Sequence, residues 1–166
     1  MNAIDASVVD TAADGLNIVA FCCHYCAYAA ADMAGSLRMQ YPESVKVVKL
    51  PCTGKLDVQL ILDAFEHGAD GVMIAGCMEG DCHYQQGNLN AKRRAAYSQD
   101  LLRSIGLEVE RVRMFNMSSA MANRWAAAVT EMDETVRKLG PSPLRRGTKV
   151  AAAESSAEKS SPGSST

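Results

Sequence analysis

The feature that most restricts the fold of this sequence is a regular alternation between short apolar runs and longer segments with helical periodicity. The runs have the composition of β-strands, and in the segments between them apolar residues recur every three or four positions. The predicted strands are residues 17–21, 45–50, 71–75 and 109–115, and the predicted helices are residues 27–39, 57–67, 89–105 and a last one from Ser118 or Ser119 to Gly140. Strict alternation predicts an α/β fold, with a small, open, mostly parallel four-stranded sheet and helices on its faces.

The two ends of the chain differ in composition from this alternating region. Residues 1–16 are small and acidic without periodicity, and residues 141–166 are rich in Ser, Ala, Lys and Glu. Such segments bury too little apolar surface to offset the entropy that ordering them would cost. We therefore predict a flexible N-terminus (1–16), one folded domain (17–140) and a disordered Ser/Ala-rich tail (141–166).

Charge and hydropathy argue against several classes of protein. The net charge of −2 gives no global reason to expect a nucleic-acid partner. Apolar runs stay well short of the roughly 20 residues that a membrane helix needs. Residues 1–15 contain three Asp and no Lys or Arg, so they lack the basic start of a secretory signal. We expect a cytoplasmic protein with no membrane span.

The six cysteines carry most of the functional information. In a cytoplasmic protein the thiols stay reduced, so a disulfide framework is not expected. Three of the predicted strands end at a cysteine, and the carboxyl ends of parallel strands lie along one edge of a sheet, where ligand sites form. We therefore expect all six thiols to gather at the edge defined by these strand ends. The cysteines are Cys22, Cys23, Cys26, Cys52, Cys77 and Cys82.

A group of thiolates selects soft metals, which include zinc, copper(I) and the iron of iron–sulfur clusters. The spacings Cys22-x3-Cys26 and Cys77-x4-Cys82 favour an iron–sulfur cluster held between two loops, and there are more thiols than a zinc ion requires. Two alternatives stay open. One is a thiol–disulfide redox protein that uses Cys23 and Cys26, and the other is a zinc-bound structural module.

Two polar features lie close to the cysteines in sequence. His83 follows Cys82 directly and is interpreted as a neighbour of the site or a surface residue rather than a ligand. Lys92, Arg93 and Arg94 lie near the start of the third predicted helix. This basic run is interpreted as a solvated helix face, with a docking patch or a counter-charge for an anionic cluster as the alternative.

Three segments carry a family resemblance. FCCHYCAYAAADMAG (21–35), PCTGKLD (51–57) and AGCMEGDCHYQQGNLNAKRR (75–94) resemble the delta subunit family of methyl-viologen-reducing hydrogenase, over about residues 17–139. The resemblance implies a [2Fe–2S] cluster and an electron-transfer subunit that is not catalytic alone. It further implies a relay of single electrons from a hydrogenase or another dehydrogenase module to an HdrA-like flavoprotein subunit, in a heterodisulfide reductase-type or benzoyl-CoA reductase-type complex of an anaerobe.

The resemblance also implies that the cluster ligands are drawn from the six cysteines, of which a [2Fe–2S] cluster takes four. The preferred set contains one pair from each loop: Cys22 with Cys26, and Cys77 with Cys82. Cys52 is the first substitute and Cys23 is another. Cys22 and Cys23 are not both expected to ligate, because neighbouring side chains at a strand end point to opposite sides.

Overall fold

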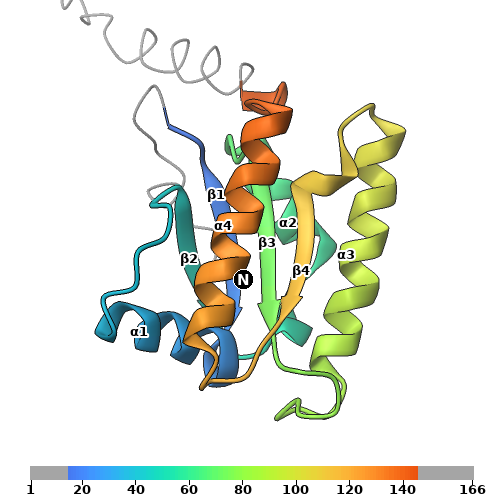
Figure 1. Cartoon of the computed structure of the whole chain (residues 1–166). Helices are drawn as coiled ribbons and strands as arrows, with labels where there is room; N and C mark the ends of the chain where they lie inside the picture. Colours follow the sequence, from blue (N-terminus) through green and yellow to red (C-terminus); the bar gives the residue numbers. More distant parts are fainter. Residues whose placement is uncertain (1–14, 146–166) are drawn as a thin grey trace, which may run out of the picture.

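A four-stranded parallel sheet is the framework of the computed structural model, which describes residues 15–145 (Figure 1). The strands lie in the order β2-β1-β3-β4, and each neighbouring pair is parallel. Their bounds are β1 (Ile18–Cys23), β2 (Val45–Leu50), β3 (Gly71–Gly76) and β4 (Val112–Asn116). The predicted α/β fold with a parallel four-stranded sheet is confirmed.

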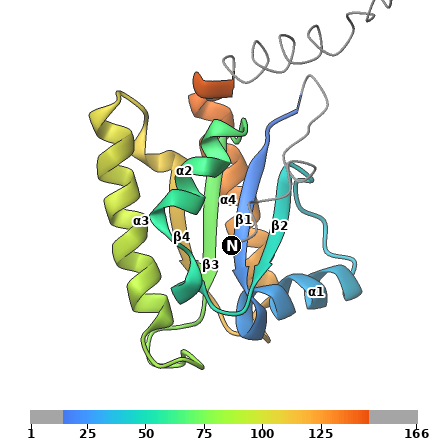
Figure 2. The same ribbon diagram turned by 180° about the vertical axis from the view of Figure 1, so that it is seen from behind.

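Two helices cover each face of this sheet, as the two opposite views show (Figures 1 and 2). One face is covered by α1 (Ala29–Ser36) and α4 (Ala122–Leu139), and the other by α2 (Val58–Glu66) and α3 (Gly87–Ser104). Side chains alternate along β1, so that Ile18 belongs to the core under α1 and α4, and Val19 to the core under α2 and α3. The central strands β1 and β3 are therefore buried on both faces, which explains their unbroken apolar sequences.

The strands at the edges of the sheet, β2 and β4, are only partly buried. Their sequences alternate apolar residues with Lys or Arg, which is the pattern of a strand with one solvated side. Lysine on an edge strand also discourages pairing with another chain. The sequence pattern thus separates the two edge strands from the two central strands.

Local structure differs from the sequence prediction at several boundaries, among them the end of β1, which lies at Cys23 rather than at residue 21. Residues 109–111 form a short 3-10 turn rather than the start of a strand, because the buried Arg111 guanidinium is drawn to the carbonyls of Asp70 and Gly140. The prediction that Ser118 or Ser119 caps the last helix is wrong. The Met121 N–H bonds the Ser118 carbonyl in a turn, and α4 begins only at Ala122 without a side-chain cap. Residues His24–Tyr28 form a π-helical turn before α1.

The amino ends of the strands are held by a buried carboxylate, Asp70. It accepts hydrogen bonds from the backbone N–H groups of Asn17 and Ser142 (2.8 Å each) and an ion pair from Arg145 Nη1 (2.9 Å). The same guanidinium group donates to the Gly15 carbonyl (3.0 Å). These contacts join the first and the last described residues, whereas the rest of the predicted N-terminus and tail, 1–14 and 146–166, lies outside the described residues.

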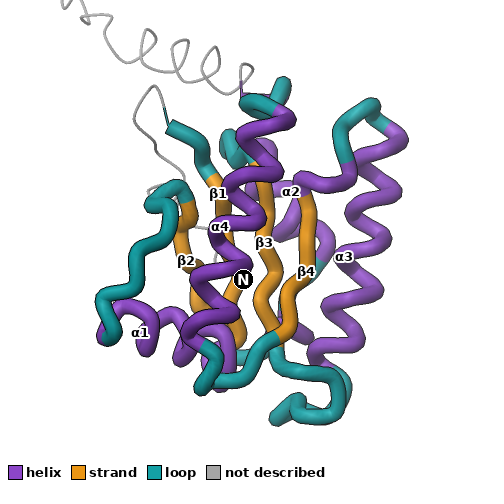
Figure 3. Tube along the Cα trace, in the orientation of Figure 1, coloured by secondary structure: helices purple, strands orange, loops and turns teal. Residues whose placement is uncertain are grey.

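The loops that follow the strands meet at the opposite, carboxyl end of the sheet, drawn at the bottom of Figure 3. In the strand order β2-β1-β3, the next strand in sequence, β2, lies on one side of β1, and the following strand, β3, lies on the other side. Such a switch point opens a crevice between the two loops, where α/β proteins bind their ligands. Within residues 15–145, no helix is long and apolar enough to cross a membrane.

Candidate metal centre

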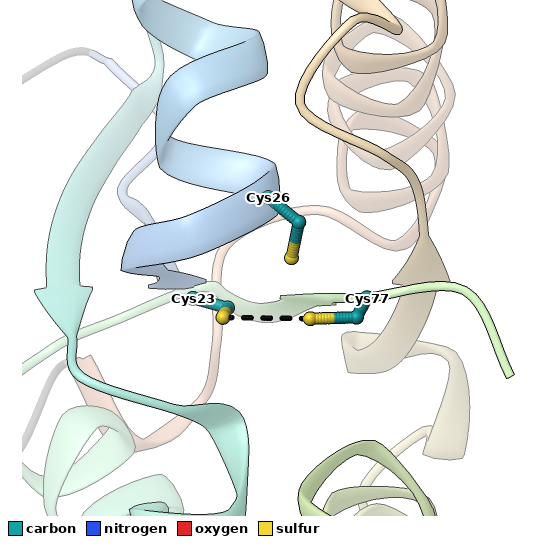
Figure 4. Close-up of side chains that lie close together, drawn as sticks. All are labelled: Cys23, Cys26 and Cys77. Atoms are coloured by element: carbon teal, nitrogen blue, oxygen red, sulfur yellow. Dashed lines mark hydrogen bonds between the residues drawn. The ribbon is translucent and has the colours of Figure 1, made fainter. Parts of the chain in front are cut away.

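Three thiols come together at the switch point between β1 and β3 (Figure 4). Cys23 is the last residue of β1, Cys26 lies in the π-helical turn that follows, and Cys77 comes directly after β3. Their sulfur atoms all lie within 4.8 Å of one another, and the Cys23 and Cys77 sulfurs are 3.7 Å apart. The neighbouring strand ends of a parallel sheet thus bring together thiols that are 54 positions apart in sequence.

A second pair of thiols lies at the same edge. Cys52 follows β2, and Cys82 lies in the loop between β3 and α3, with 4.0 Å between their sulfur atoms. Electrostatic coupling connects Cys82 with Cys77, and Cys52 with Cys23, so the pair belongs to the same site as the first three thiols. Five of the six predicted thiols therefore form one buried group, which we call the thiol site: Cys23, Cys26, Cys52, Cys77 and Cys82.

Cys22 is the thiol that the structure places differently from its neighbours. Its side chain alternates with that of Cys23 and shares the core under α1 and α4 with Ile18 and Ala20. Among the described residues, the compact three-thiol group contains Cys23 and does not include Cys22. Burial raises the pKa of Cys22, as expected for an apolar, inert thiol. The ligand set stays a prediction, but the arrangement favours Cys23 over Cys22.

The Cys23 sulfur lies where a negative charge is well stabilised. A hydrogen bond from the Cys26 thiol, helped by the backbone N–H groups of Tyr25 and Cys26, lowers the pKa of Cys23 to about 5 despite its burial. The same interaction and burial raise the pKa of Cys26. Burial raises the pKa of Cys77 to about 11.

The Cys82 sulfur lies at the amino end of α3. Burial raises the pKa of Cys82, but backbone N–H groups at the start of the helix outweigh this effect and the net pKa is lowered. Helix amino ends stabilise anions in this way because their first N–H groups have no partner within the helix. The N–H donors to Cys82 come from Tyr84, Gly87 and Asn88. Cys52 has one such donor, the Gly54 N–H at 3.3 Å, and burial raises the pKa of its thiol.

Two glycines allow the backbone to approach this pair of thiols. A Cβ atom on Gly87 would lie 2.3 Å from the Cys52 sulfur and 3.2 Å from the Cys82 sulfur. A Cβ atom on Gly54 would lie 2.6 Å from the Gly87 α-carbon. The distances of 2.3 Å at Gly87 and 2.6 Å at Gly54 are too short for a Cβ atom. Glycine is therefore required at both positions beside the thiols.

The donor set fits a soft metal or an iron–sulfur cluster. Two thiolates on one tetrahedral metal ion with bonds of about 2.3 Å lie about 3.8 Å apart. The Cys23–Cys77 distance of 3.7 Å and the Cys52–Cys82 distance of 4.0 Å both match this spacing. The surrounding N–H groups supply the hydrogen bonds to sulfur that tune iron–sulfur clusters. Cys23, Cys26 and Cys77 could therefore hold a metal ion, and Cys52 and Cys82 form a second thiol pair with a similar spacing.

Exposed rings cover the loops that carry these thiols. The Tyr25 ring stacks on the His83 ring with 4.1 Å between centroids, and Tyr84 approaches Tyr25 edge-on at 6.1 Å. Tyr25 and Tyr84 are 45% and 53% exposed. The interpretation of His83 as a neighbour of the site rather than a ligand stays a prediction. We call this group the aromatic cap, and it comprises His24, Tyr25, Tyr28, His83 and Tyr84.

The basic run at the start of α3 is partly structural. Lys92 forms an exposed ion pair with Glu79 (2.7 Å). Arg94 donates to the carbonyls of Gly54 and Leu56, at 2.7 Å each, and so fixes the turn that follows Cys52. Arg93 is exposed. Sequence reasoning does not find this role of Arg94, because its carbonyl partners lie about 40 positions earlier in the chain.

Comparison with known proteins gives consistent matches over the described fold. Residues 18–140 match the family model described as methyl-viologen-reducing hydrogenase, delta subunit. The vhu iron-sulfur D subunit of the F420-non-reducing hydrogenase of Methanocaldococcus jannaschii is 49% identical over 128 residues, which are 77% of this chain and 96% of that protein. The corresponding iron-sulfur D subunit of Archaeoglobus profundus is 48% identical over 130 residues, or 78% and 95% of the two chains.

A longer protein contains a similar region. This protein is the A subunit of the ferredoxin:CoB-CoM heterodisulfide reductase of Methanosarcina mazei. It is 36% identical over 124 residues, which are 75% of this chain but 16% of that protein. A chain with the fold described above thus occurs both as a small separate protein and as a part of a much larger one.

Proposed function

This chain belongs to the delta subunit family of methyl-viologen-reducing hydrogenase, and we propose that it is an iron–sulfur subunit that relays single electrons within an oxidoreductase complex. The observation that carries the proposal is the thiol site, in which five buried thiols from the ends of β1, β2 and β3 and the loops that follow them converge beside N–H donors. The subunit is not catalytic by itself, since its role is to take up and pass on electrons.

The group that we propose for this site is a [2Fe–2S] cluster, which takes four cysteine ligands and carries one electron at a time when bound. Two ligand pairs match the spacing of thiolates on one metal ion, Cys23 with Cys77 and Cys52 with Cys82. Cys77 and Cys82 belong to the set expected from the sequence, and Cys23 and Cys52 are its two substitutes. Cys26 is then a fifth thiol, whose sulfur atom lies within 4.8 Å of the Cys23 sulfur.

The proposed electron acceptor is an HdrA-like flavoprotein subunit, and the proposed donor is a hydrogenase or another dehydrogenase module. The similar region within the heterodisulfide reductase A subunit of Methanosarcina mazei supports this pairing, because domains that are joined in one protein commonly work together as separate subunits in another. The hydrogenase relatives support the donor. A benzoyl-CoA reductase-type complex is a further setting for the same acceptor. We expect the complex to be cytoplasmic and to function in an anaerobe, without a nucleic-acid partner.

We propose that electrons enter or leave through the aromatic cap. The thiol site is buried, but Tyr25 lies one residue from Cys26, and His83 lies next to Cys82. The exposed rings above both loops form an apolar patch of the kind that becomes buried in protein–protein interfaces. A partner that docks on the cap comes as close to the thiols as this surface allows.

The experiment that tests the proposal is anaerobic purification followed by iron and sulfide assays, visible absorbance and EPR spectroscopy of the dithionite-reduced protein. We expect about two iron and two sulfide ions per chain and a signal of spin one-half. Stoichiometric zinc with no iron would replace the redox role by that of a zinc-bound structural module. A metal-free protein that cycles a Cys23–Cys26 disulfide would establish the thiol–disulfide alternative instead.

A further inference from the structure

Thr53 carries a buried hydroxyl group that has no hydrogen-bond partner among the described residues. The side chain is 1% exposed, and its Oγ1 atom is shielded from solvent. Folded proteins rarely leave a buried hydroxyl unsatisfied, since the group has given up water without gaining another partner. An acceptor outside the described polypeptide would satisfy the Thr53 hydroxyl.

The position of Thr53 connects this hydroxyl with the thiol site. Thr53 directly follows Cys52 and opens the 3-10 turn Thr53–Lys55. Its Oγ1 atom faces Gly76, where a Cβ atom would lie only 3.1 Å from it, and Gly76 directly precedes Cys77. The hydroxyl thus belongs to the residue after Cys52 and lies against the residue before Cys77.

Trp125 and Ser142 carry buried groups in the same condition. Trp125 Nε1 lies near the start of α4 in the same core cluster as the thiols, and Ser142 Oγ lies near Asp70 at the amino ends of the strands. Next to Thr53, the methyl group of Met114 approaches the same side of Gly76, and it offers no acceptor. Thr53 is distinguished by its place in the chain, because it directly follows Cys52 and lies against the residue that precedes Cys77.

We propose that Thr53 is a positioning residue for the cluster and that its hydroxyl group donates a hydrogen bond to a cluster sulfur atom. The inference rests on the proposed function, because it requires a bound cluster as the acceptor. A hydrogen bond to sulfur stabilises the reduced cluster more than the oxidised one, since the reduced cluster carries more negative charge. The hydroxyl of Thr53 consequently raises the reduction potential of the subunit.

Two substitutions separate the hydroxyl from the shape of the side chain. Thr53→Val keeps the branched shape and removes the donor, whereas Thr53→Ser keeps the donor and removes the methyl group. Thr130→Val is the matched control, because the Thr130 hydroxyl bonds the Ala126 carbonyl within α4, in a helix that carries none of the thiols. All variants are purified anaerobically with their clusters, and iron content is measured first.

The decisive readouts are the midpoint potential and the exchangeable protons coupled to the reduced cluster, measured by ENDOR spectroscopy in H2O and D2O. We expect Thr53→Val to retain its iron, to shift to a lower potential and to lose one exchangeable proton signal. Thr53→Ser restores both properties, and Thr130→Val matches the wild type.

An unchanged potential and proton spectrum in Thr53→Val would overturn the inference while leaving the proposed function intact. A wild-type protein without iron would instead remove the proposed function itself. If Thr53→Val binds no iron, Thr53→Ser decides: a retained cluster with wild-type potential supports the hydroxyl, and a lost cluster assigns Thr53 to packing and overturns it.

Discussion

The α-carbon of Gly87 lies against the Cys52 sulfur, so closely that a Cβ atom at this position would be 2.3 Å from the thiol. Gly87 is also the first residue of α3, whose N–H groups point at Cys82. Gly87 thus both leaves room for the Cys52 sulfur and donates a backbone N–H to Cys82. Its replacement tests whether this pair belongs to the metal centre.

We expect Gly87→Ala to lose its cluster while α3 remains folded. The added methyl group displaces the Cys52 thiol, and overpacking of this kind costs about 1–3 kcal/mol of folding free energy. Iron per chain and visible absorbance measure the loss, and circular dichroism follows the helix. Gly35→Ala is the matched control, because Gly35 lies in α1 with nothing within 4 Å of the new methyl group. Full iron content in Gly87→Ala would exclude the Cys52–Cys82 pair as ligands in their present positions.

Single cysteine substitutions distinguish ligands from the fifth thiol. We expect Cys77→Ala to lose the cluster, and Cys26→Ala to keep about two iron ions per chain with a lower reduction potential, since a donor to the Cys23 sulfur is removed. Cys22→Ala is the control, with iron content and EPR spectrum unchanged. Loss of iron in Cys26→Ala, together with its retention in Cys23→Ala or Cys52→Ala, would reassign the ligand set.

The metal-free, reduced protein should contain a thiolate at unusually low pH. Because the pKa of Cys23 is lowered to about 5, chiefly by the Cys26 hydrogen bond, its thiolate persists at pH 7 and protonates only as the pH falls toward 5. Thiolate absorbance near 240 nm, recorded from about pH 8 down to about pH 4, reports this step. It should be absent from Cys23→Ala, and in Cys26→Ala it should move up toward the ordinary cysteine value of about 8.5. A titration of Cys26→Ala that is identical to that of the wild type would contradict the assigned cause.

Asp70 should be the most sensitive charged residue for stability. Its carboxylate is fully buried and holds Asn17, Ser142 and Arg145. Removal of one partner from a buried ion pair costs about 3 kcal/mol or more, so we expect Asp70→Asn to lower the free energy of unfolding by about that amount in urea titrations. Asp100→Asn, which breaks an exposed pair with Arg103, serves as the control and should change little. Equal effects of the two substitutions would show that Asp70 gains little from its buried partners.

The aromatic cap can be tested through binding. We expect the double variant Tyr25→Ala/Tyr84→Ala to bind an HdrA-like flavoprotein subunit about tenfold or more weakly, because aromatic side chains contribute strongly to interfaces. Iron content and the EPR signal should stay unchanged. Tyr97→Ala, which removes an equally exposed ring from α3, is the control for isothermal titration calorimetry. Unchanged affinity in the double variant would place the docking surface elsewhere.

The fold can be predicted from sequence because its signals are local. The apolar run of β3 and the alternating pattern of β2 each contain enough information to mark a strand, and their order then implies a parallel sheet. Boundaries are less predictable where a distant partner decides them. The turn at residues 109–111 depends on the buried contacts of Arg111 with Asp70 and Gly140, which no local pattern reveals.

The convergence of the thiols is also predictable, but their individual placement is not. The ends of the predicted strands place the cysteines at one edge of the sheet. Whether Cys22 or Cys23 faces Cys77 depends on where β1 ends, because adjacent side chains of a strand point to opposite sides. The local apolar pattern ends this strand at Phe21, two residues before the observed end at Cys23. That shift decides which side chain faces the core and which faces Cys77.

The contact between Arg145 and the Gly15 carbonyl has a consequence for how this fold can be used in larger proteins. The first and last described residues meet at one end of the sheet (Figure 1), and the thiols lie at the other end, where β1, β2 and β3 finish. This fold can therefore be inserted into a longer polypeptide with little change in the path of the host chain, and the end that carries the thiols then lies away from both junctions. Because its two ends lie close together, the described fold is suited to circular permutation and to insertion into another chain.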